Sequence, residues 1–197
     1  MRNWSKSVYV IDGDAQEVKE LYELMKDLGK RKEPFVRNSY GTTFLGCLLA
    51  ALEEKWYAED CQGAWYNLEM VDDTLRFTVE TIISPRPMVF DLVCKKYPSL
   101  TNYYRAEDPA TLLYETNDRE GKYFPEKYRV EVFTLEDKFM AEYFTELPAM
   151  FEWLGKIFGQ SVKSEEQVNE LVAQWQKESK YAYCYIDEFK IVDRKIY

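Results

Sequence analysis

The strongest constraint on the fold is a pair of alternating segments on either side of a short acidic turn. Apolar and polar side chains alternate in residues 65–71 and again in residues 74–82, and Asp72-Asp73 lies between them. Two such runs around a turn indicate a β-hairpin with one buried face. A slip of one residue would bury the charged face instead, so the pattern also fixes the register. The expected apolar face consists of Tyr66, Leu68, Met70, Leu75, Phe77 and Val79.

Other segments place this hairpin within a larger order of elements. Residues 7–12 include a run that is apolar on both faces, as in a central strand, and residues 15–28 carry an apolar stripe at helical spacing. The further expected elements are a helix near 43–56, a helix over 86–97 with Ser84 as its cap and Pro85 at its first position, and an extended segment within 100–115. Without the helix near 43–56, the order is βαββαβ, the ferredoxin-like motif.

These elements predict an α+β protein with a ferredoxin-like antiparallel sheet and helices on one face, plus a C-terminal α/β extension. We expect residues 1–125 to form this core, with the helix near 43–56 as an insertion. Residues 126–197 would be an extension packed on the core, because no linker rich in Gly, Pro or Ser separates the two. The extension is expected to contain a hairpin at 128–133 and 139–144, helices at 147–158 and 168–175, and a strand at 181–192.

Short motifs give the core a resemblance to a known family. They are Asn3-Trp4 before a strand, Leu75-Arg76-Phe77 leading to Ser84-Pro85, and Tyr97-Pro98-Ser99-Leu100 before an extended segment. In these motifs the core resembles the ferredoxin-like domain of the YubB proteins, which are encoded on plasmids and phages. The family usually begins Pro-Asn-Trp-Cys, whereas Arg2 and Ser5 flank the shared pair here. The resemblance implies a ferredoxin-like fold and an association with mobile genetic elements, and it assigns no catalytic residue.

Several kinds of chemistry are excluded by composition or spacing. The chain has no histidine, which removes Ser-His-Asp and Cys-His catalysis and every histidine metal ligand. Thr116–Gly121 resembles a calcium loop, but Lys127 stands where the closing glutamate would be, which favours a polar turn. The cysteines are far apart, without a Cys-x-x-Cys pair, and are expected as small buried apolar residues: Cys47, Cys61, Cys94 and Cys184. We therefore predict no catalytic residue, cofactor or metal.

Aromatic residues supply the candidate interface. They make up 16% of the chain, and 16 of them are tyrosines. Tyr181, Tyr183 and Tyr185 would share one face of the last strand. Such a face can stack nucleic-acid bases when Lys and Arg surround it, but the neighbours here are Asp187 and Glu188. The interpretations, in order of preference, are packing in the core and at its rim, binding of a protein partner, and direct nucleic-acid binding, which these acidic neighbours disfavour.

The distribution of charge suggests an alternative function. The net charge is −9, and residues 39–160 alone hold 12 basic and 21 acidic side chains. The basic cluster Lys30-Arg31-Lys32 is expected in a solvated loop. An inhibitor that imitates nucleic acid and occupies a DNA-binding enzyme would need carboxylates in a regular row. Such a row would include Glu59, Asp60, Glu107 and Asp108.

The preferred prediction is a non-enzymatic protein-interaction module carried on a mobile genetic element, and the acidic inhibitor is the alternative. The longest apolar run, Phe44–Leu52, is far shorter than the roughly 20 residues of a membrane span. No signal-peptide pattern is recognised at the first residues, so we expect a cytoplasmic protein. The sequence leaves the oligomeric state open.

Overall fold

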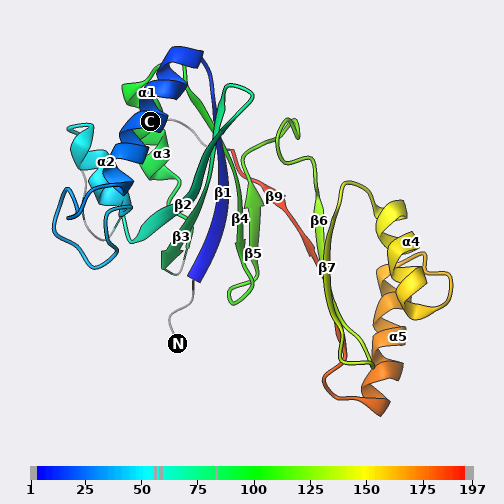
Figure 1. Cartoon of the computed structure of the whole chain (residues 1–197). Helices are drawn as coiled ribbons and strands as arrows, with labels where there is room; N and C mark the ends of the chain where they lie inside the picture. The colour runs from blue at the N-terminus through cyan, green and yellow to red at the C-terminus, as the bar shows by residue number, and fades with distance from the viewer. Residues whose placement is uncertain (1–3, 56, 58–59, 83, 194–197) are drawn as a thin grey trace. The chain divides into compact units, whose positions relative to one another are not determined.

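The chain divides into two compact units (Figure 1). The computed structural model describes residues 4–55, 57, 60–82 and 84–193. The first unit contains the chain up to Arg119 and again from Ile191, and the second unit is Glu120–Lys190. The α+β class is confirmed, because the described residues form five helices and two sheets. Packing of residues 126–197 on the core stays a prediction.

The main sheet of the first unit is built around its first strand. Its strands are β1 Trp4–Asp12, β2 Gly63–Val71, β3 Thr74–Ile82, β4 Thr101–Asp108, β5 Leu113–Thr116 and β9 Lys190–Ile191, and the sheet order is β2-β3-β1-β4-β5-β9. β1 pairs antiparallel with both β3 and β4, and β2 pairs antiparallel with β3. The predicted four-segment sheet, from residues 7–12 through the hairpin to a strand within 100–115, is therefore confirmed.

The helices described in the first unit lie on one side of this sheet (Figure 1). They are α1 Ala15–Gly29, α2 Leu45–Ala51 and α3 Met88–Lys96. Asp14 caps α1, since its Oδ1 accepts hydrogen bonds from the backbone N–H groups of Gln16 and Glu17 at 2.9 and 3.2 Å. The predicted stripe of this helix is buried and packs in one core with residues of the sheet and of α3.

The predicted start of α3 at Ser84-Pro85 is wrong. The helix begins at Met88, follows Pro87, and has no side-chain cap. The residue before a proline is biased away from the helical region, so Pro87 disfavours a helical Arg86. The Ser84 carbonyl instead accepts a hydrogen bond from Thr81 Oγ1 at 2.7 Å, which holds this segment against the end of β3.

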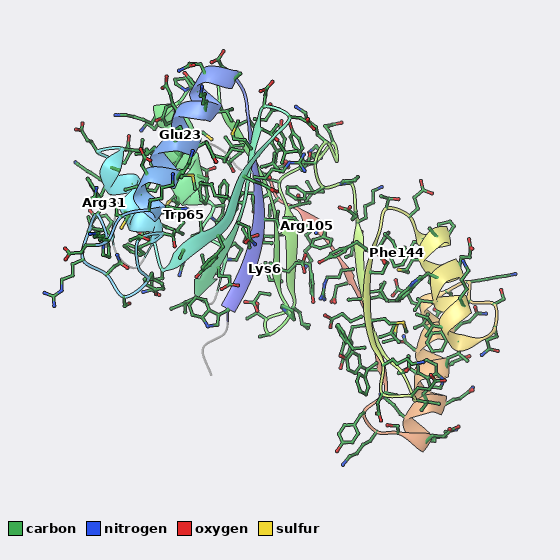
Figure 2. The ribbon with its side chains drawn as sticks, in the orientation of Figure 1. Lys6, Glu23, Arg31, Trp65, Arg105 and Phe144 are labelled. Atoms are coloured by element: carbon green, nitrogen blue, oxygen red, sulfur yellow. The ribbon has the colours of Figure 1, made fainter. Side chains whose placement is uncertain are left out.

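The predicted apolar face of β2 is wrong at Tyr66. Tyr66 is 44% exposed, whereas the preceding Trp65 is 2% exposed and belongs to the core (Figure 2). The register of β2 on β3 shifts between Tyr66 and Glu69, and Asn67 has a φ of 52°. One extra residue therefore bulges from β2, which reverses the alternation. The bulge puts Trp65 on the helix-covered face while Leu68 and Met70 still pack against the core.

An aromatic cluster lies at the centre of the first core. The ring centroid of Tyr9 is 4.3 Å from that of Phe90, 5.4 Å from that of Phe77 and 5.5 Å from that of Tyr104. All four side chains are at most 2% exposed. Such ring pairs add about 0.5–1.5 kcal/mol each beyond the burial of their area. The cluster thus joins β1, β3, β4 and α3.

The Tyr97-Pro98-Ser99-Leu100 motif forms the connection between α3 and β4. Ser99 Oγ donates to Glu17 Oε2 at 2.7 Å and accepts from the Asp14 backbone N–H at 3.1 Å. A Cβ atom at Gly13 would lie 2.5 Å from the Ser99 carbonyl oxygen, so only glycine permits this approach. The motif therefore ties the start of α1 to the start of β4.

The second unit has its own sheet and core. Its strands are β6 Tyr128–Phe133, β7 Phe139–Phe144 and β8 Tyr183–Glu188, in the order β7-β6-β8, and its helices are α4 Leu147–Phe158 and α5 Glu165–Glu178. Val130 and Val132 of β6 are buried with Met150, Leu154 and Val168 of the helices. Ser164 caps α5, and its side chain accepts a hydrogen bond from the Gln167 N–H. Within the part of the chain described, no helix is long and apolar enough to cross a bilayer.

The bulge predicts losses of stability of very different size for two neighbouring residues. Trp65→Ala removes a buried ring and should lower the free energy of unfolding by ~3–5 kcal/mol. Tyr66→Ala acts on a half-exposed ring and should cost less than ~1 kcal/mol. Guanidinium unfolding of both full-length variants, followed by far-UV circular dichroism, measures the difference. A larger loss for Tyr66→Ala would mean that the strand alternates without the bulge.

Candidate functional site

The structure brings together two of the three tyrosines of the predicted interface. Tyr183 and Tyr185 lie on one face of β8, and their ring centroids are 4.8 Å apart. Tyr181 lies in the turn before the strand, where it is 66% exposed and Lys180 Nζ is 5.0 Å from its ring centroid. The predicted single strand at 181–192 is therefore wrong in extent: β8 spans Tyr183–Glu188, and Lys190–Ile191 is a separate strand of the main sheet. Tyr181 stands apart from the stacked pair.

Two phenylalanines that sequence analysis did not select complete this surface. Phe133 of β6 is the register partner of both Phe139 on β7 and Tyr183 on β8. Register partners in an antiparallel sheet share a face, and the Phe133 and Tyr183 ring centroids are 5.9 Å apart. We call Phe133, Phe139, Tyr183 and Tyr185 the aromatic face. The sequence contains one indication of this face. Phe133 is an aromatic residue at one of the alternating strand positions that otherwise hold polar side chains, whereas Val130 and Val132, at the other positions, are buried.

The aromatic face is neutral and can donate hydrogen bonds. Arg129 and Glu131 of β6 point to the same side and form an ion pair with each other. Burial, followed by the nearby Glu131 carboxylate, raises the pKa of Tyr183. Its hydroxyl therefore stays protonated at neutral pH. Phe139 and Tyr185 are 56% and 58% exposed, so large rings are presented to solvent beside phenol hydroxyls.

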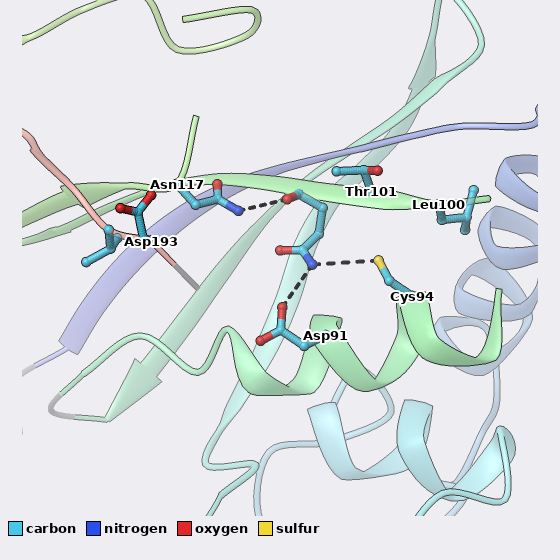
Figure 3. Close-up of a pocket in the computed structure, with 8 residues that line it drawn as sticks. Asp91, Cys94, Leu100, Thr101, Asn117 and Asp193 are labelled. Carbon is cyan, nitrogen blue, oxygen red and sulfur yellow. Dashed lines mark hydrogen bonds between the residues drawn. The ribbon is translucent and has the colours of Figure 1, made fainter. Parts of the chain in front are cut away.

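A cavity of about 260 Å³ lies in the first unit (Figure 3). Asp91 and Cys94 reach it from α3, and Leu100, Thr101 and Asn102 reach it from the start of β4. The other lining residues are Asn117, Val192 and Asp193. The Val192 N–H donates to the Thr116 carbonyl at 2.9 Å, and Arg119 Nη2 contacts Asp193 Oδ1 at 2.6 Å, so both contacts hold the returning chain at the cavity.

Asparagines organise the polar side of this cavity. Asn102 Nδ2 donates to Asp91 Oδ1 at 3.1 Å and contacts Cys94 Sγ at 3.6 Å. Asn117 Nδ2 donates to the Asn102 carbonyl, and Asn117 Oδ1 accepts from the Tyr104 N–H, both at 2.8 Å. Asn102 is 8% exposed, and its buried Oδ1 has no hydrogen-bond partner.

The cavity does not have the features of a cysteine or metal centre. Burial raises the pKa of the Cys94 thiol to about 11, so the thiol is protonated at neutral pH and is a poor nucleophile. Across the described ranges, no group of three or more His, Cys, Asp or Glu side chains could hold a metal ion. In the segment 116–121, which resembles a calcium loop in sequence, Thr116 Oγ1 donates to the Tyr104 carbonyl at 2.7 Å. Thr116 and Asn117 therefore hold the backbone.

The paired carboxylates do not converge on a common point. Glu107 contacts Arg105 at 3.4 Å, and the buried Asp108 accepts from the Ala110 N–H at 3.1 Å. Asp72 and Asp73 have φ values of 47° and 61° and form the hairpin turn. Glu59 lies outside the described residues. The acidic residues described above therefore form turns or contact neighbouring residues of their own strand.

Comparisons with known proteins give no relative. No family model, curated protein or solved structure matches this chain. The aromatic face and the cavity are the two candidate functional sites of the described residues.

The raised pKa of Cys94 predicts its reactivity. The rate of iodoacetamide alkylation at this thiol should rise about tenfold per pH unit from about pH 7 to about pH 9, because thiolate forms progressively below the pKa. An ordinary thiol, with a pKa of about 8.5, would level off within this range. Peptide mapping by mass spectrometry measures the rate at Cys94, and the denatured chain is the control. A plateau in the native protein would contradict the effect of burial.

Proposed function

We propose that this protein is a non-enzymatic interaction module whose second unit binds a protein partner through the aromatic face. The observation that carries the proposal is the exposure of Phe139 and Tyr185 on a sheet face where Phe133 and Tyr183 already stack. Tyr is enriched in protein interfaces because it combines a large apolar ring with a polar tip. Stacked rings also lose little conformational freedom when a partner binds.

The chemistry around the face favours a protein over a nucleic acid. The nearest basic side chain on β6, Arg129, is paired with Glu131, and Asp187 is its register partner on β8. A surface that binds nucleic acid combines its stacking rings with cations that contact phosphates. The neutral aromatic face instead suits an apolar patch on a protein partner that also offers acceptors for the tyrosine hydroxyl groups.

The first unit supports a narrower proposal about ancestry. We propose that it is a ferredoxin-like domain related to the YubB proteins, and hence carried on a mobile element. Support comes from the sheet order β2-β3-β1-β4, from α1 and α3 on one face, and from the Tyr97–Leu100 motif that joins α3 to β4. All four cysteines are free thiols, the state that a reducing cytoplasm maintains. The cytoplasm is the location proposed.

The alternative, an acidic inhibitor that imitates nucleic acid, has less support. Asp108 is fully buried, and Glu107 is only 16% exposed at its side chain and contacts Arg105. A mimic of the phosphate backbone needs carboxylates at the surface. The interaction module is therefore the proposal that the described geometry favours.

Photo-crosslinking tests the interface directly. Benzoylphenylalanine in place of Tyr185 should form a defined covalent adduct in the expressing cells, because the ring would lie against the partner. The matched control has the same probe at Tyr66, a similarly exposed tyrosine of the first unit. The adduct should disappear when Phe139→Lys is added, which places a charge in the aromatic face.

Adduct mass and solution mass identify the partner class. An adduct of twice the chain mass, together with a dimer by light scattering, would make the partner a second copy of this chain. The absence of any adduct at position 185, or the same adducts from both probe positions, would refute the proposed interface.

A further inference from the structure

The cavity between α3 and the start of β4 contains a buried acceptor without a donor. Asn102 lines the cavity, is more than nine-tenths buried, and its Oδ1 has no partner. A buried polar atom without a hydrogen bond is costly, and native proteins keep few of them. Such an atom at a cavity indicates that the cavity accommodates a group with a donor.

The orientation of the Asn102 amide is fixed by its neighbour. Its Nδ2 faces Asp91 Oδ1 at 3.1 Å, and a carboxylate can only accept hydrogen bonds. Rotating the amide by half a turn would place two acceptors against each other. The unpaired atom is therefore the oxygen, and its missing partner is an N–H or O–H group.

The two carboxylates at the cavity favour a positively charged ligand. Asp91 and Asp193 both line it, and Arg119 Nη2 contacts both carboxylate oxygens of Asp193 at 2.6 Å. The chain has no histidine, and the described residues contain no three-ligand group for a metal ion. The cavity therefore offers an amide oxygen and carboxylates as acceptors, but not the ligand set of a metal site. An organic cation with N–H donors matches these acceptors.

The size of the cavity limits that cation to a small one. About 260 Å³ is several times the roughly 30 Å³ that a water molecule occupies in the liquid. It is below the ~300–1,000 Å³ of pockets that hold drug-sized ligands. A group of a few heavy atoms therefore fits the space.

We propose that this cavity binds a small organic cation, an alkylammonium or guanidinium compound, whose N–H donates to Asn102 Oδ1 and whose charge faces Asp91 and Asp193. This site lies in the first unit and is independent of the interface proposed for the second. Asn102 would act as the positioning acceptor, while Asn117 fixes the backbone beneath it.

Two monovalent probes separate donor recognition from general attraction to an acidic chain. Methylguanidinium has N–H donors, and tetramethylammonium has the same charge without them. In ¹H–¹⁵N NMR spectra of the full chain, methylguanidinium should shift the side-chain amide signals of Asn102 and Asn117 in a saturable manner. Tetramethylammonium at equal concentration and ionic strength should leave them unchanged.

Matched variants locate the site. Asn102→Leu keeps the approximate shape and removes the acceptor, so the Kd for methylguanidinium should rise about tenfold. Asp193→Asn removes a largely exposed carboxylate and releases Arg119, which should also weaken binding, while the Val192–Thr116 hydrogen bond still holds the returning chain. Asp73→Asn is the control, because it removes one negative charge of the first unit in a hairpin turn whose positive φ suits asparagine. This control should change the Kd less than about twofold.

Three results would overturn the proposal. Equal shifts with both probes would show that charge alone attracts the cation. An equal loss of affinity in Asp73→Asn and Asp193→Asn would show that the binding is not at the cavity. No saturable shift in the folded wild-type chain would mean that only water occupies the space beside Asn102.

Discussion

The packing of Tyr9 is the interaction on which the first unit most depends. β1 pairs on both edges, with β3 and β4, so its inward side chains lie in the middle of the sheet. The Tyr9 ring contacts Phe77 and Tyr104 on those neighbours and Phe90 on α3 above them. One side chain thus fixes the spacing between the sheet and α3. The cavity depends on that spacing, because Asp91 and Asn102 approach each other from these two elements.

Much of this fold could be predicted because its determinants are periodic and local. The alternation of Leu75, Phe77 and Val79 indicates a strand face, and Asp14 before an apolar stripe indicates the start of a helix. The predicted elements were wrong where a single residue interrupts the repeating pattern of apolar and polar side chains. Asn67 adopts a left-handed conformation and bulges the strand, which leaves no mark in a hydrophobicity pattern and exchanges the roles of Trp65 and Tyr66. Pro87, two residues after Pro85, delayed the start of α3.

The candidate sites were less accessible to sequence analysis because they depend on pairing between distant segments. The stacking of Tyr183 and Tyr185 follows from strand alternation, but their neighbour Phe133 is placed there by the register of β6 on β8. The cavity gathers Asp91, Asn102 and Asp193 from three separate parts of the chain. No spacing rule relates these residues, and the unpaired oxygen of Asn102 is visible only once its surroundings are known.

The contact between Val192 and Thr116 has a consequence for how the chain folds. The second unit is an insertion, since the first unit resumes at Ile191 after ending at Arg119. Closing a flexible loop costs conformational entropy that increases with its length. A folded second unit replaces most of that loop with a compact body, which lowers the cost of bringing Val192 back to Thr116. During synthesis the second unit can form its core before the segment from Ile191 leaves the ribosome, and that segment then joins the first unit.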